Sequence, residues 1–73
     1  MTYNYIGRLV MNANHLTQGS KAIIVDDLEY AVVMIFIEKF VTKEGFAKVV
    51  LRNFTSGDQV VVDGDTKVKQ LLF

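Results

Sequence analysis

The chain has 73 residues, of which 8 are basic and 8 are acidic; 51% are hydrophobic and none is a cysteine. This length predicts a single domain, residues 1–73, and the lack of cysteine excludes a disulfide framework, a zinc finger and a thiol nucleophile. The balanced charge argues against a nucleic-acid binder that relies on bulk electrostatics. Because so short a chain has a thin core, self-association is the first hypothesis for what stabilises it.

The residue types favour β-strands. Val and Ile together supply 16 residues, whereas Ala supplies 4 and Pro none, and β-branched side chains fit a pleated sheet better than a helix. Short turn motifs with glycine, asparagine or aspartate separate the apolar segments. The predicted strands are Tyr3–Val10, Lys21–Val25, Glu29–Phe40, Phe46–Phe54, Gln59–Val62 and Lys67–Leu72. Their spacing is typical of a small all-β barrel or sandwich.

Three local features refine these predictions. The Asp63-Gly64 pair predicts a hairpin between the last two strands. The stretch His15-Leu16-Thr17 is too short and polar for a strand, and one helical turn is plausible there. A helix over Leu28–Phe40 is the main rival prediction, but the β-branched residues between Val32 and Ile37 and the lack of a capping pattern disfavour it.

The run from Tyr30 to Ile37 is apolar on both faces of a strand. Since side chains alternate, one face must fill the barrel, and the other is exposed unless something covers it. The N-terminal strand Tyr3–Val10 is one candidate cover, and a second subunit is the other. For the second case we predict at least a dimer, in which the interface residues are Tyr30, Val32, Met34 and Phe36.

The segment Phe46–Phe54 alternates more regularly. Ala47, Val49 and Leu51 are predicted to point inward. The opposite face would carry Phe46, Lys48, Val50, Arg52 and Phe54. Basic side chains interleaved with aromatic rings are typical of a platform for single-stranded nucleic acid, and Lys67 and Lys69 on the last strand could extend it. The alternative is an ordinary outward face whose phenylalanines pack at the barrel ends or against a partner.

Catalytic chemistry is not indicated. His15 is the one histidine, and the carboxylate pairs Asp26-Asp27 and Asp63-Gly64-Asp65 lie in predicted turns, where aspartates bond to the backbone. We therefore expect no enzyme activity, no metal and no cofactor. The start of the chain has no signal-peptide pattern, and the longest uncharged apolar run is far shorter than the ~20 residues of a spanning helix. A cytoplasmic protein with no membrane partner is expected.

Four motifs in chain order suggest a family. They are Asn14-His15-Leu16-Thr17-Gln18-Gly19, Ile23-Ile24-Val25-Asp26-Asp27-Leu28-Glu29-Tyr30, Lys43-Glu44-Gly45-Phe46-Ala47-Lys48-Val49 and Phe54-Thr55-Ser56-Gly57. From Asn14 to about Gln70 the chain resembles the N-terminal domain of elongation factor P and of the hypusine-bearing translation factor, without their OB domains. The resemblance implies a KOW-type, SH3-like β-barrel of five strands, to which this chain adds an N-terminal strand. It also implies that Lys43 falls at the tip lysine that these factors modify.

Two functions follow as hypotheses. The first is a non-enzymatic SH3-like binding module that contacts RNA, the ribosome or the transcription machinery through Lys43 and the basic-aromatic face. The second is a small interaction protein that forms homo-oligomers, or docks on one protein partner, through apolar strands and without nucleic acid. Salt dependence distinguishes them, because contacts to phosphate weaken steeply with salt and apolar contacts do not.

Overall fold

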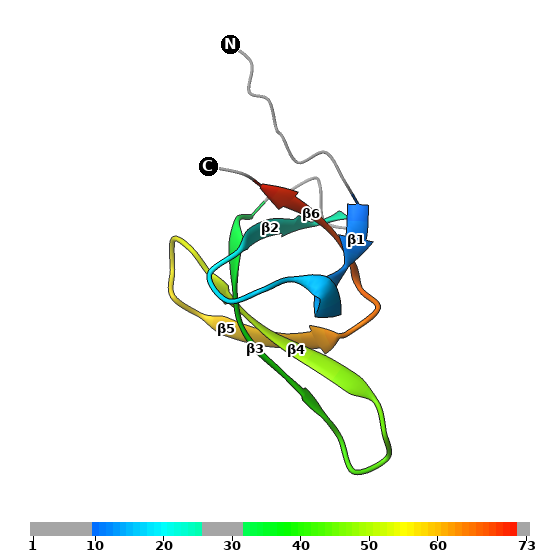
Figure 1. Ribbon diagram of the computed structural model, residues 1–73. Helices are drawn as coiled ribbons and strands as arrows, with labels where there is room; N and C mark the ends of the chain where they lie inside the picture. Colours follow the sequence, from blue (N-terminus) through cyan, green and yellow to red (C-terminus); the bar gives the residue numbers. More distant parts are fainter. Residues whose placement is uncertain (1–9, 26–31, 72–73) are drawn as a thin grey trace.

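The computed structural model describes residues 10–25 and 32–71, and its strands form one antiparallel sheet (Figure 1). The strands are β1 (Val10–Asn12), β2 (Lys21–Ile24), β3 (Met34–Val41), β4 (Ala47–Asn53), β5 (Gln59–Asp63) and β6 (Lys67–Leu71). A 3-10 turn, η1 (Ala13–His15), follows β1. The strand order in the sheet is β1-β6-β2-β3-β4-β5. The predicted all-β fold is confirmed: the sheet curves into a small barrel-like form, which is not closed because no pairing joins β1 to β5 in the described part of the chain.

Four of the predicted strands agree with the observed ones to within one residue at each end over the described residues; they are Lys21–Val25, Phe46–Phe54, Gln59–Val62 and Lys67–Leu72. Of the predicted strand Glu29–Phe40, Met34–Phe40 lies in β3, whereas Val32 and Val33 precede the strand, and the residues before Val32 lie outside the described part of the chain. The rival helix is therefore wrong over the described residues. The predicted N-terminal strand Tyr3–Val10 lies outside the described residues except for Val10, which begins β1. The helical turn predicted at His15-Leu16-Thr17 is present as η1, slightly earlier in the chain.

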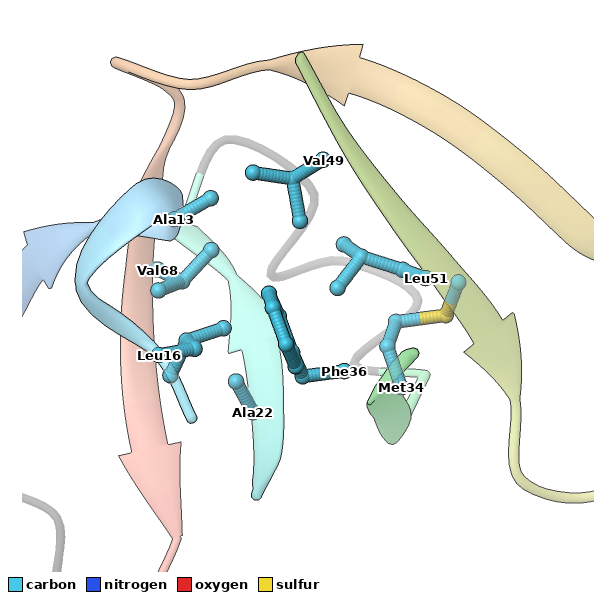
Figure 2. Close-up of a cluster of buried hydrophobic side chains, with 8 residues drawn as sticks. All are labelled: Ala13, Leu16, Ala22, Met34, Phe36, Val49, Leu51 and Val68. Atoms are coloured by element: carbon cyan, nitrogen blue, oxygen red, sulfur yellow. The ribbon is translucent and has the colours of Figure 1, made fainter. Parts of the chain in front are cut away.

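The core lies inside the curved sheet, and its side chains among the described residues are apolar. Figure 2 shows its side chains pointing towards one another, with Phe36 between the β2 side and the β4 side. The cluster comprises Ala13, Leu16, Ala22, Met34, Phe36, Val49, Leu51 and Val68. Every described strand except β1 and β5 contributes to this cluster, while Met11 and Val62 pack against it from those two strands. Ala13 of η1 and Leu16, the residue after it, therefore fill one end of the barrel.

An irregularity in β3 changes which side chains face the core. Phe36 pairs with Leu51, but Glu38 pairs with the next β4 residue, Val50, so that Ile37 has no partner of its own. Such a β-bulge inserts one residue and reverses the inward-outward alternation beyond it. Phe36 is 5% exposed and Phe40 is 43% exposed, although an unbroken strand would place both on one face.

The prediction of a hairpin at Asp63-Gly64 is wrong. The chain does turn there, with the Thr66 amide donating to the Asp63 carbonyl at 3.0 Å. However, β5 pairs with β4, whereas β6 pairs with β1 and β2. The turn backbone forms hydrogen bonds to two distant segments: the Gly64 amide donates to the Ala47 carbonyl, and the Gly64 carbonyl accepts from the Asn14 amide. These contacts lead the chain from one end of the sheet to the other.

Candidate binding surface

The outward face of β4 has the alternation predicted for it. Val49 and Leu51 are fully buried, and Ala47 is half-buried on the same inward face. Lys48 and Arg52 lie on the outward face, opposite Phe40 and Ile35 of β3. Phe46 and Phe54 flank the strand and are both exposed. The basic-aromatic face, which we define as Phe46, Lys48, Val50, Arg52 and Phe54, is therefore an accessible surface except at its centre.

The centre of this face divides it into two ends. Val50 is only 8% exposed, between Glu38 of β3 and Val61 of β5 in the sheet register. Lys48 forms an ion pair with Asp63 of β5, which offsets its charge. At about 3.4 Å per residue, Phe46 and Phe54 are roughly 27 Å apart along the strand. The face consequently offers two separate contact regions.

The first region lies where β2, β3 and β4 run side by side. Lys21 pairs with Ile35, and Ile35 pairs with Arg52, so the two cationic side chains lie on one face with a single strand between them. The Lys21 Nζ lies 5.8 Å from the centroid of the Phe54 ring. A cation at this distance is attracted by the ring electrons. We call Lys21, Arg52 and Phe54 the base cluster.

Sequence reasoning predicted Arg52 and Phe54 but missed Lys21. Lys21 is the first residue of β2, and the second residue, Ala22, is buried. Because side chains alternate along a strand, Lys21 lies on the outward face. The identity of the neighbouring strand was needed to bring it beside Phe54. The amide of Phe54 also donates to the Val33 carbonyl at 2.9 Å, which ties this end of the face to the segment before β3.

The second region is the tip of the β3–β4 hairpin, which extends beyond the barrel (Figure 1). The Thr42 amide donates to the Phe46 carbonyl, and the Phe46 amide donates to Thr42 Oγ1 at 3.0 Å. Gly45, with a φ of 96°, adopts the left-handed conformation that this turn requires. Lys43 is exposed and has no ion pair or side-chain hydrogen bond among the described residues. We call Lys43 and Phe46 the tip cluster.

The two lysines predicted on β6 do not join either cluster. Lys67 and Lys69 lie on either side of the buried Val68 and so share a face, as predicted. Lys67 donates to Asn12 Oδ1, and Lys69 is half-buried opposite Ile23 and Val10. Both β2 and β3 separate β6 from β4 in the sheet. The predicted extension of the basic-aromatic face onto β6 is therefore not a continuous patch.

The residues predicted for a subunit interface occupy different environments. Met34 and Phe36 belong to the core of the same chain, so their assignment to an exposed interface is wrong. The reason is that the even-numbered residues at the start of β3 point inward, against Leu51 and Ala22. Val32 is exposed. Tyr30 lies outside the described residues.

The described residues contain no group of three or more histidine, cysteine or acidic side chains that could hold a metal ion. His15 is exposed at the end of η1. Over the same residues, no helix is long and apolar enough to cross a membrane. Comparisons with protein-family models, curated proteins and solved structures found no match for this chain.

Proposed function

We propose that this protein is a non-enzymatic RNA-binding module that acts in the cytoplasm. The observation that carries the proposal is the base cluster, in which Lys21 and Arg52 lie beside the exposed Phe54 ring on one face of the sheet. An exposed ring gives an unpaired base a stacking surface, and the adjacent cations contact the phosphates on either side of it.

The tip cluster supplies the second contact. The hairpin holds Lys43 and the exposed Phe46 away from the barrel, so they reach a partner that the barrel itself does not touch (Figure 1). A lysine at a hairpin tip is also what the resemblance to the N-terminal domain of elongation factor P implies for Lys43. Lys43 therefore acts as the leading contact of the hairpin with RNA or with an RNA-containing assembly such as the ribosome.

The net charge of zero sets the expected strength of binding. Long-range attraction to the phosphate backbone is weak in a protein without excess positive charge. Binding must then come from short-range contacts, with stacking contributing about 1–3 kcal/mol per base. We expect measurable affinity at low salt and a shallow dependence on salt, since few phosphates are contacted.

Titration of labelled single-stranded RNA into the full chain tests the proposal. Phe54→Ala should weaken binding with little change in the salt slope, because a ring carries no charge. Arg52→Ala should reduce the salt slope by about one unit. Lys48→Ala is the matched control on the same strand: its charge is already offset by Asp63, so the slope should change less than in Arg52→Ala.

Lys43→Ala tests the tip separately. It should weaken RNA binding while the free energy of unfolding stays within about 0.5 kcal/mol of the parent, because Lys43 is an exposed turn residue. Glu44→Ala, beside it in the turn, should not weaken binding. Failure of the parent chain to bind RNA at low salt, at protein concentrations on the order of tens of micromolar, would contradict the proposal, since typical non-specific binders have Kd values of about 1–100 µM even at physiological salt.

A further inference from the structure

Strand β5 is an open edge of the sheet formed by the described residues. Among the described strands it pairs only with β4, and its outer edge pairs with none. Its sequence, Gln59-Val60-Val61-Val62-Asp63, has no lysine or proline, and Val60 and Val61 are 42% and 57% exposed. Proteins usually protect edge strands with charges, prolines or bulges, because an open edge pairs readily with another strand.

The register shows which backbone groups face the open edge. The Asn53 amide at the end of β4 donates to the Asp58 carbonyl just before β5, at 2.7 Å. In an antiparallel pair, every second residue of a strand directs its amide and carbonyl groups towards the neighbouring strand. Since Asp58 bonds to β4, Val60 and Val62 also direct their backbone groups towards β4. Val61 lies between them and directs its own groups outward. Its amide and carbonyl are therefore available to a further strand.

We infer that β5 pairs with β5 of a second copy of this chain, antiparallel, about a two-fold axis at Val61. In this register Val61 lies opposite Val61 of the second copy and exchanges both backbone hydrogen bonds with it. Val60 lies opposite the Val62 of that copy, so the exposed valines of each strand cover those of the other. The same surface patch serves both copies, as a closed two-fold dimer requires.

The charges on β5 favour the antiparallel arrangement. Asp63 is the one charged residue of the strand, and Lys48 already pairs with it. In the antiparallel register each Asp63 lies opposite Gln59 of the second copy, whose side-chain amide can donate to the carboxylate. A parallel register would set the two Asp63 side chains directly opposite each other, and like charges in that position are destabilising.

This self-association does not depend on RNA binding, because the base and tip clusters contain no β5 residue. The two proposals are therefore tested separately. If the protein dimerises but does not bind RNA, only the RNA-binding proposal is contradicted. If it binds RNA but remains a monomer, only the dimer is contradicted.

Two short edge strands make a small and therefore weak interface. Sedimentation equilibrium of the full chain between about 1 and 200 µM should accordingly show a monomer–dimer equilibrium. Val61→Lys places two ammonium groups across the axis and should leave a monomer. Val61→Pro removes the outward amide, which has no backbone partner among the described residues, and should also leave a folded monomer. Val41→Lys is the control, because Val41 is an exposed valine on the hairpin and should not affect the dimer.

Single cysteines test the register, since the chain has no cysteine of its own. Val61→Cys should form a disulfide-linked dimer under mild oxidation, because opposed residues in this kind of pair have Cα atoms about 5.5 Å apart. Val60→Cys should crosslink at least tenfold more slowly, because its counterpart is displaced along the strand. A monomer at every concentration, a dimer that survives both Val61→Lys and Val61→Pro, or equal crosslinking by the two cysteines would overturn the inference.

Discussion

Gly64 shows how a single residue holds three segments together. Its amide donates to the Ala47 carbonyl at 2.8 Å, and its carbonyl accepts from the Asn14 amide at 2.9 Å. A Cβ atom at this position would lie 2.9 Å from the Ala47 Cβ and 3.2 Å from the Asn14 Cβ. Glycine is required here by close approach and not by its backbone conformation, because its φ is not positive. The residue connects β4, η1 and the turn before β6.

We therefore expect Gly64→Ala to lower the free energy of unfolding by about 1–3 kcal/mol, the usual cost of forcing an extra carbon into a packed site. Urea denaturation measures the change. In an Ala47→Gly background, which removes the nearest atom, the same substitution should cost less. Equal costs in the two backgrounds would show that the contact with Ala47 does not determine the requirement for glycine.

At the level of elements, the bulge in β3 lets one strand serve two purposes. Before the bulge, Met34 and Phe36 fill the core. Beyond it, Glu38 faces outward opposite Val50, and the Lys39 Nζ donates to the Asn14 carbonyl at 2.8 Å. Without the inserted residue, the carboxylate of Glu38 would share the core face with Phe36, and burying an unpaired charge is costly. The bulge thus allows an apolar barrel strand to continue as an exposed hairpin.

The two β3 phenylalanines provide a direct test of this arrangement. Phe36→Ala should cost about 3–5 kcal/mol of stability, because it leaves a cavity in the core. Phe40→Ala should cost less than about 1 kcal/mol, since its ring lies on the exposed face of the hairpin. Thermal unfolding followed by circular dichroism compares them. Similar losses for both variants would mean that the alternation is not reversed at Ile37.

For the whole molecule, the sheet brings the two ends of the described chain together. Strand β6 lies between β1 and β2, and its Val68 is fully buried in the core. The first described strand therefore bonds to the last, and the barrel lacks its central pairings until the chain is nearly complete. Topologies dominated by such distant pairings fold slowly, on a scale of about milliseconds to seconds for small β proteins.

A chain shortened to end at Thr66 should consequently lack a cooperative unfolding transition. It would lose β6 and with it both the β1 and the β2 pairing. Removal of Val68 would also open the core beside Leu16 (Figure 2). Urea titration followed by circular dichroism provides the measurement. A sigmoidal transition in the shortened chain would show that β2 to β5 fold without β6.

The sequence by itself determined the local structure. β-branched residues and glycine-bearing turns placed β2 to β6, and period-two alternation in β4 identified Val49 and Leu51 as inward and Arg52 as outward. These properties depend on neighbours within a few residues, so they can be read along the chain. The exposed Lys43 at a glycine-bearing turn belongs to the same class of local information.

Tertiary structure alone decided which segments meet. Local turn chemistry at Asp63-Gly64 predicted a hairpin, yet the bonds of Gly64 to distant residues send β6 to the other end of the sheet. The bulge at Ile37, the approach of Lys21 to Phe54 and the open edge of β5 likewise depend on which strands pair and in which register. Strand order and register are set by the packing of all the apolar faces at once, and no single segment of the sequence contains that information.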